Sequence, residues 1–380
     1  MAKSPRRNLL ELAGVFLKLG LVGFGGPAAH VAMMEDEVVR RRGWLSRERF
    51  LDLLGATNLI PGPNSTEMAI HIGQLRAGWA GLVAAGVSFI LPAFLIVLAC
   101  GWAYVRFGAL PASVGILYGV KPVIVAVVLQ ALWGLGRAAT RTRAIAVVGV
   151  VSLAAVAAGV HELLVLFLAG AALAARRRVH EARSGGTVHG FLPLLSVAAA
   201  GTSAAAIPFG LLPLFLFFLK VGSVLFGSGY VLLAFLRADL VERWGWLTEA
   251  QLLDAVAVGQ VTPGPVFTTA TFIGYVLGGT PGAVLSTLGI FLPAFAFVAL
   301  SGPLVPRLRR SPVAGAFLDG VNVASIALMA VVTARLARVA VADVPALVLA
   351  LASAVLLIRF RVNSAWLVLG GAALGAALRR

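Results

Sequence analysis

The sequence has 380 residues, of which 60% are hydrophobic and 12% are charged, and this excludes an ordinary soluble domain and indicates a polytopic membrane protein. The net charge of +16 comes from arginines at the ends of apolar segments, which favours positive-inside membrane topology over nucleic-acid binding. The single cysteine, Cys100, excludes a disulfide within the chain and a thiolate metal cluster, and no cofactor is expected.

The first two predicted elements are helices that are broken by glycine and proline. Residues 8–39 read as an apolar helix, the break "GFGGP" at 23–27 and a second short helix. Residues 48–76 read as a helix, the break Pro61-Gly62-Pro63 and another helix. Each helical part has about 14 to 17 residues, too few to span a ~30 Å bilayer core, so we expect two re-entrant hairpins.

The second break has the features of an anion-binding helix end. Its prolines stop one helix and start another, and its glycine permits an unusual backbone dihedral. The free N–H groups of Asn64, Ser65 and Thr66 would then face the break, where a helix N-terminus attracts anions.

Further apolar segments follow the broken helices and predict transmembrane helices. In the first part of the chain they are residues 79–105, 112–136, 144–160 and 162–175, and later residues 279–305, 312–334, 344–358 and 362–378. The segment 191–210 has no counterpart elsewhere, and we expect an extra transmembrane helix there, within a linker at 184–212.

The second part of the chain repeats the first. Three pairs of segments match in order: residues 16–46 with 218–248, Pro-Gly-Pro at 61–63 with 263–265, and "LPAF" at 91–94 with 292–295. The sequence therefore predicts an all-α polytopic membrane protein with two homologous halves, residues 1–183 and 213–380. Each half would hold broken hairpins followed by transmembrane helices.

The charges of equivalent loops indicate that the two halves have opposite orientations. Residues 35–49 hold five arginines, and the matching residues 237–250 hold two. The bias reverses later, since residues 106–111 hold one arginine and their counterpart at 307–310 holds three. By the positive-inside rule this reversal favours inverted repeats, although one later pair of loops is basic in both halves.

Two lysines occupy identical repeat positions inside apolar segments. Lys18 and Lys220 both lie in "FLK(L/V)G", and a helix beginning near Asn8 would place Lys18 about 15 Å deep in the bilayer. An ammonium group at that depth marks a substrate or ion path more often than not. A third lysine, Lys121, has a weaker case because its repeat partner is Asn322.

The candidate site combines these lysines with the helix ends of both halves. The predicted substrate-binding residues are Lys18, Gly25, Gly26, Gly62, Asn64, Ser65, Thr66, Lys220, Gly227, Ser228, Gly264, Thr268 and Thr269. Two intramembrane carboxylates, Glu67 and Asp319, are candidates for neutralising a lysine or carrying a coupling proton, and no metal ligands are expected. His30 and His71 are expected to be structural.

The motifs "FGGP", "EVVRRRGWLS", "PGPNS" and "FILPAF", with "WGWLTEAQLLDAVAVGQVTPGP" in the second half, closely resemble the chromate ion transporter family in its long, two-domain form. The resemblance implies bacterial inner-membrane proteins that export chromate and confer chromate resistance, some of them associated with sulfate. It maps the family's glycine motif to Gly25, Gly26 and Pro27. The sequence departs from the family pattern at Asn58 and Glu67, where glutamine is expected.

These observations together predict a secondary active transporter of tetrahedral oxyanions, foremost a chromate exporter. Transport of sulfate or another oxyanion, and an anion channel that uses the same helix ends, remain alternatives. An enzyme is not expected, because "FGSGY" at 226–230 resembles a nucleophile loop but its first-half partner "FGGPA" lacks the serine. The expected partners are chromate or sulfate and the lipid bilayer, with a homodimer left open and no nucleic acid.

Overall fold

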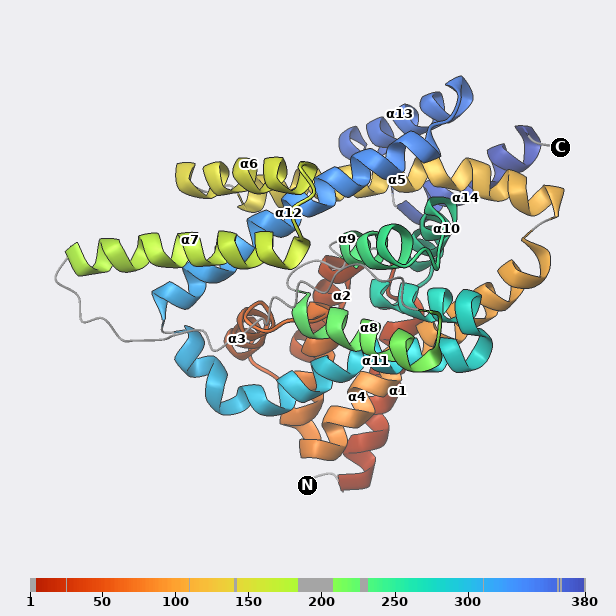
Figure 1. The fold of residues 1–380 in the computed structure, drawn as a ribbon. Coiled ribbons are helices and arrows are strands. Elements are labelled where there is room, and N and C mark those ends of the chain that lie inside the picture. Colours follow the sequence, from red (N-terminus) through yellow and green to blue (C-terminus); the bar gives the residue numbers. More distant parts are fainter. Residues whose placement is uncertain are drawn as a thin grey trace.

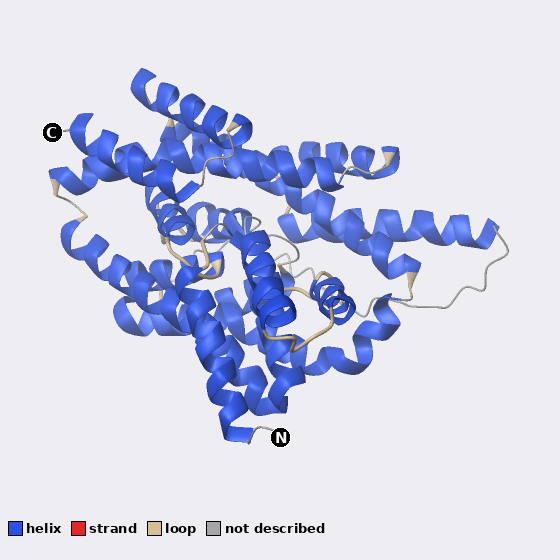
Figure 2. Ribbon diagram, turned by 180° about the vertical axis from the view of Figure 1, so that it is seen from behind, coloured by secondary structure: helices blue, strands red, loops and turns tan. Residues whose placement is uncertain are grey.

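The structure is a computed structural model that describes residues 5–24, 26–108, 110–139, 142–183, 208–225, 232–309, 311–360, 362 and 364–378. Within these ranges the chain forms helices and short connections, with no strand (Figure 2). The all-α prediction is confirmed. The extra transmembrane segment expected at 191–210 lies almost entirely outside the described residues.

Seven α-helices and a π-helical segment are described in the first half (Figure 1). They are α1 (Pro5–Val22), α2 (Gly26–Glu35), the π-helix η1 (Asp36–Arg41), α3 (Arg47–Thr57), α4 (Asn64–Phe107), α5 (Pro111–Ala139), α6 (Arg143–Ala157) and α7 (Glu162–Arg183). The breaks expected after the first helix and at Pro-Gly-Pro are both present, between α1 and α2 and between α3 and α4.

The second half follows the same order. It consists of α8 (Leu211–Val224), α9 (Leu232–Leu236), the π-helix η3 (Arg237–Arg243), α10 (Glu249–Val261), the 3-10 turn η4 (Val266–Thr268), α11 (Thr269–Arg309), α12 (Pro312–Ala340), α13 (Val344–Arg359) and α14 (Ser364–Leu378). Even the π-helix recurs, since η1 and η3 occupy equivalent positions.

Helices α4 and α11 each turn back on themselves at a glycine. Gly78 in α4 and Gly279 in α11 both have φ of +61°, a conformation that glycine adopts without strain. A Cβ added to Gly73 would lie 2.2 Å from the carbonyl oxygen of Gly81, so the two arms of α4 touch backbone to backbone. Each long helix is therefore a short arm, a tight turn and a longer arm.

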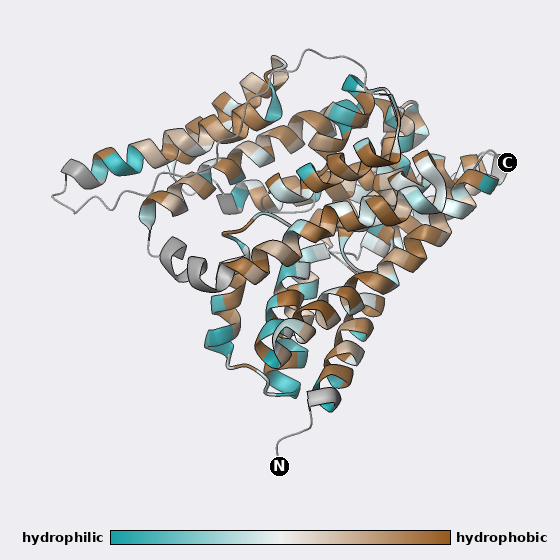
Figure 3. Ribbon diagram, turned by 60° about the horizontal axis from the view of Figure 1, so that its bottom comes forward, coloured by the Kyte–Doolittle hydropathy of each residue, from teal (hydrophilic) through white to brown (hydrophobic). Residues whose placement is uncertain are grey.

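The described helices have the length and composition of a membrane protein. Four segments are long and apolar enough to cross a bilayer: Asn64–Phe107, Val114–Arg137, Val266–Leu300 and Pro312–Ala340. Figure 3 shows hydrophobic residues along the bodies of most helices. Large side chains such as Trp133, Leu168 and Leu300 are exposed, which suits a surface that faces lipid.

The two halves interlock instead of packing as separate bodies. Within each half the first helix packs on the long bent helix, α1 on α4 and α8 on α11. Across the halves, α6 and α7 pack on α12, while their equivalents α13 and α14 pack on α5 (Figure 1). Helices α4 and α11 also pack on each other at the centre. The junction between the halves is therefore built from long helices of both.

The glycine that follows each repeated lysine brings two helices close together. A Cβ on Gly20 of α1 would lie 2.5 Å from the carbonyl oxygen of Phe89 in α4. A Cβ on Gly222 of α8 would lie 2.4 Å from the carbonyl oxygen of Ile290 in α11. The repeated "FLK(L/V)G" motif is thus in part a helix-packing motif, as small residues are in membrane bundles.

Candidate functional site

The two Pro-Gly-Pro breaks are bonded to the opposite halves of the protein. The N–H of Gly62 donates to the carbonyl of Leu225, which follows α8, at 2.8 Å. In return, the N–H of Gly264 donates to the carbonyl of Gly23, which follows α1, also at 2.8 Å. Gly23 and Leu225 are equivalent in the repeat, so the two hydrogen bonds form a reciprocal pair. Each half completes the broken helix of the other.

The "LPAF" motifs meet the same breaks. Gly62 and Gly264 have φ of +137° and +92°, which strongly favour glycine. A Cβ on Gly264 would lie 2.7 Å from the Cβ of Ala93, and one on Gly62 would lie 3.6 Å from the Cβ of Ala294. These alanines belong to the two "LPAF" segments, again each from the opposite half. The Pro-Gly-Pro breaks, the "LPAF" segments and the residues that follow α1 and α8 are far apart in the sequence, and they meet at the junction between the halves.

The first turn of α4 partly satisfies its own N–H groups. The N–H of Thr66 donates to the carbonyl of Pro63 at 2.8 Å, so the expectation that it is free for an anion is wrong. The turn closes on Pro63 because that residue is the N-cap of the helix. Asn64 and Ser65 supply the two earlier N–H groups of this helix end. The side-chain amide of Asn64 also donates to Oδ1 of Asn58 at 2.8 Å.

At the equivalent helix end of the second half, the threonine hydroxyls donate their protons to backbone carbonyls of the same turn. Oγ1 of Thr268 donates to the carbonyl of Pro265, and Oγ1 of Thr269 donates to the carbonyl of Val266, both at 2.8 Å. These hydroxyls therefore direct lone pairs outward, and an anion needs protons. The first-half end is the better suited of the two to an oxyanion.

A small cavity adjoins the second break. It is lined in part by Val256, Gln260, Val266 and Thr269, and its volume is about 10 Å³. This space suits at most a single water molecule and is far too small for a tetrahedral oxyanion. This cavity, lined by residues of the second half, is therefore not a place where the substrate fits in this structure.

Lys220 forms an ion pair with a buried carboxylate that sequence reasoning missed. Its Nζ contacts Oδ2 of Asp239, which lies in η3, and Arg243 contacts the other oxygen of the same carboxylate. The side chain of Asp239 is only 4% exposed, so its charge needs these partners. Lys220 is therefore engaged and is not a free cation for the substrate.

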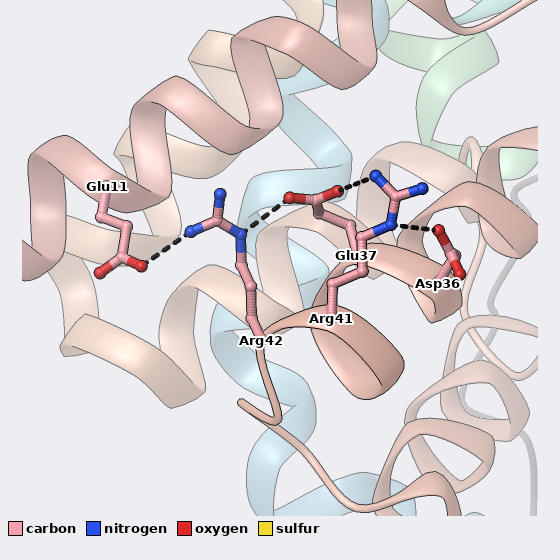
Figure 4. A network of polar contacts seen from close by, with 5 residues as sticks. All are labelled: Glu11, Asp36, Glu37, Arg41 and Arg42. Atoms are coloured by element: carbon pink, nitrogen blue, oxygen red, sulfur yellow. Dashed lines mark hydrogen bonds and ion pairs between the residues drawn. The ribbon is translucent and has the colours of Figure 1, made fainter.

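Lys18 has an equivalent neighbour in Glu37, at the repeat position of Asp239. Glu37 accepts a hydrogen bond of 2.8 Å from Arg42, which also donates to Glu11 at 2.7 Å (Figure 4). The hydrogen bond from Arg42 holds the pKa of Glu37 below its ordinary value, helped by the charges of Arg42, Lys18 and Arg41 and opposed by desolvation. The repeated lysines thus belong to two charge clusters, one in each half.

Glu67 is the most isolated charged residue of the described chain near the breaks. Its side chain is fully buried, and neither carboxylate oxygen has a hydrogen-bond partner among the described residues. A Cβ on Gly62 would lie 2.3 Å from Oε1 of Glu67, so the carboxyl group lies against the first break. Such a position requires a proton or a cation, because an unpaired buried charge is costly. Asp319, the other expected carboxylate, is exposed on α12.

The remaining predicted residues lie near the first glycine break or outside the residues that the structure describes. Gly26 begins α2 with φ of +78°, whereas Gly25, Gly227 and Ser228 lie outside the described residues. His30 is buried, and its Nε2 lies 2.9 Å from the carbonyl oxygen of Gly23. This contact fits the structural role expected for His30.

A further polar cluster was not expected. Asp254 in α10 is 3% exposed and is ion-paired with Lys121 of α5, and it accepts a hydrogen bond from Tyr104 of α4. The sequence predicts only Glu67 and Asp319 as intramembrane carboxylates. Asp254 was not predicted because its partners lie in the other half, and no local sequence pattern indicates such a contact.

Comparison with known proteins agrees with this architecture. The family model described as chromate transporter matches residues 10–175 and again residues 212–376. A chromate transport protein of Cupriavidus metallidurans is 34% identical over 98% of this chain and 93% of its own length. One of Pseudomonas aeruginosa is 33% identical over 91% of this chain and 85% of its own length.

A probable chromate transport protein of Synechococcus elongatus is 32% identical over 91% of this chain and 89% of its own length. No solved structure matches the chain. The two family matches cover both halves, and the relatives span nearly the full length, so the similarity is not confined to one motif or one half. The chain belongs to the chromate transporter family.

Proposed function

We propose that this chain is a secondary active transporter that moves chromate across the bacterial inner membrane. Two relatives that match over most of their length are named for chromate transport, and the apolar helices of this chain fit a multi-pass membrane protein. The observation that carries the proposal is the reciprocal bonding of two broken helices across two halves. Family membership argues for a transporter and against an enzyme. In direction, we propose export, which would confer chromate resistance.

The proposed mechanism is alternating access between inverted halves. Equivalent positions carry an ion pair of reversed sign: Arg47 contacts Glu35 at 3.5 Å in the first half, whereas Glu249 contacts Arg237 in the second. Each of these pairs is neutral in sum, so the opposite orientation of the halves is supported by the arginine bias of equivalent loops, with five arginines at residues 35–49 against two at residues 237–250. The broken helices would then lie in re-entrant hairpins near the midplane. The halves interlock, so the boundaries 1–183 and 213–380 mark repeats and not independent domains.

The proposed binding site lies at the two breaks. A tetrahedral dianion would accept hydrogen bonds from the N-terminus of α4, where Asn64 and Ser65 lie, while Gly62 and Gly264 allow the two breaks to pack closely. We assign Lys18 and Lys220 to holding the neighbouring carboxylates in position. Glu67 would carry a coupling proton, because its buried carboxyl group has no partner in the described chain.

Transport of labelled chromate into inside-out vesicles tests this function. We expect saturable uptake that excess sulfate inhibits, because sulfate has the same charge and nearly the same shape. Preloading the vesicles with unlabelled chromate should accelerate uptake, since a carrier exchanges its substrate. Uptake equal to that of protein-free vesicles would overturn the proposal. A flux that neither saturates nor shows counterflow would indicate an anion channel.

A further inference from the structure

Two hydrogen-bond donors of the first half converge on one carboxylate of the second. Nζ of Lys121, in α5, lies 3.1 Å from Oδ1 of Asp254. The hydroxyl of Tyr104, in α4, donates to Oδ2 at 3.0 Å. Oδ2 therefore accepts a hydrogen bond, and Oδ1 has a charged neighbour in an ion pair. The cluster is buried, with 4% of the Asp254 side chain and 20% of the Lys121 side chain exposed.

An ammonium group and a hydroxyl that point at two oxygens of one anion make an oxyanion-binding arrangement. The same donors would serve two oxygens of any small oxyanion, because neither contact depends on the carbon that a carboxylate carries. In this structure the place of such an anion is taken by the protein's own Asp254. The anion and its two donors come from opposite halves, so a movement of one half against the other would separate them.

The cluster is not a requirement of the repeated fold. The first-half counterpart of Asp254 is Asp52, but the second-half counterparts of Lys121 and Tyr104 are Asn322 and Val305. If each half needed this contact for its fold, the second half would also have a lysine and a tyrosine at these positions. The donor pair therefore occurs once per chain, as expected of a site that serves one substrate at a time.

The cluster lies close to the second helix end. The ring of Tyr104 packs edge-on against Phe272, with centroids 5.1 Å apart, and Phe272 lies on the first turn of α11 after Thr269. Lys121 immediately precedes Pro122, whose missing N–H weakens α5 locally. Tyr104 thus lies beside the second broken helix, and Lys121 lies where a proline removes a hydrogen bond from α5.

We propose that Lys121 and Tyr104 form an oxyanion subsite of the transport path, and that Asp254 is its built-in competitor. Asp254 occupies the donors while the halves are closed and yields them to the tetrahedral dianion when the halves part. The proposal rests on the proposed transport of oxyanions and adds a second group of anion-binding residues to the site at the N-terminus of α4. The apparent affinity for substrate is then lowered by the fraction of time that Asp254 holds the donors.

Direct binding of labelled chromate and of labelled sulfate to the purified full-length protein tests the subsite. The key variant is Asp254→Asn, which keeps the shape and removes the competing charge. It should bind roughly tenfold more tightly, since Lys121 is released to the ligand. Lys121→Gln should bind roughly tenfold more weakly, and the double variant should lose the gain. Asp52→Asn, at the equivalent repeat position of the first half, is the matched control and should bind as the wild type does.

Tyr104→Phe provides a second arm that leaves all charges in place, in case Asp254→Asn fails to fold. It should weaken binding roughly threefold to tenfold, as expected for one lost hydrogen bond. A purely structural ion pair would make Asp254→Asn less stable without tightening binding, and that result would overturn the proposal, as would unchanged binding by Tyr104→Phe. If wild-type vesicles transport no chromate but Asp254→Asn still tightens oxyanion binding, the transport function fails and the subsite stands.

Discussion

The N–H of Gly62 donates its hydrogen bond to the carbonyl of Leu225, across the junction between the two halves, and Gly264 donates to Gly23 in the same way. A broken helix leaves polar backbone groups that a bilayer cannot satisfy. Here the groups of one half are satisfied by the other half. The breaks are therefore tied to the relative position of the halves, which is the property an alternating-access site needs.

Gly62→Ala should disable transport. The residue has φ of +137°, and its Cβ would lie 2.3 Å from Oε1 of Glu67. Backbone strain and crowding together should cost about 1–3 kcal/mol of stability and displace the break. Thermal unfolding and chromate uptake measure the two effects. The control is Gly134→Ala, where nothing lies within 4 Å, and it should leave both unchanged or raise stability slightly. Equal behaviour of the two variants would contradict the role of the break.

Glu67→Gln should separate exchange from accumulation. The substitution keeps the shape of a side chain that has no hydrogen-bond partner within the described chain, so the fold should tolerate it. A carrier that loses its coupling proton still exchanges substrate but no longer accumulates it. We expect normal chromate counterflow and at least about a tenfold loss of accumulation driven by a pH gradient. Asp319→Asn, on the exposed face of α12, should keep both activities. Retained accumulation in Glu67→Gln would remove Glu67 from coupling.

How much of this arrangement the sequence could reveal depends on whether the cause is local. The breaks at residues 23–27 and 61–63 were predicted because proline and glycine act on the backbone where they stand. The repeat was predicted because matches in register are visible without a structure. The meeting of Gly62 with Leu225 was not, since no pattern in the chain states which half each break contacts.

The charged partners were the main omission. Repetition points to Lys18 and Lys220 as candidate substrate-binding residues, but it does not point to Glu37 and Asp239 as their neighbours. Asp239 pairs with Lys220, and the charge of Lys18 acts on Glu37. Both carboxylates lie in the π-helical segments η1 and η3, and a π-helix has no simple sequence signal. Lys121 received less weight because its repeat counterpart is Asn322 and not lysine. It nevertheless pairs with Asp254 of the other half.

The Glu37 cluster predicts how stability depends on pH. The pKa of Glu37 is lowered from an ordinary value of 4.5, chiefly by the hydrogen bond from Arg42. A carboxyl group whose pKa is lower in the folded state contributes stability above its unfolded value and loses it as the pH falls. Thermal stability of the wild type should thus decline below pH 4.5, and Glu37→Gln and Arg42→Gln should both flatten this decline. Glu48→Gln, at an exposed position in α3, should not, and unchanged slopes in all three variants would rule out the cluster as the cause.

The pair Lys220 and Asp239 allows a double-mutant test of what the repeated lysines do. If Lys220 holds Asp239, then Lys220→Gln and Asp239→Asn should each lower stability, and the double variant should lose less than the sum, with a coupling of about 0.5–3 kcal/mol. Chromate affinity should be impaired in the single variants through displacement of η3 and largely recovered in the double variant. Measuring KM for uptake in all three decides the matter. Affinity that stays low in the double variant would mean that the Lys220 ammonium binds the oxyanion itself, as the sequence first suggested.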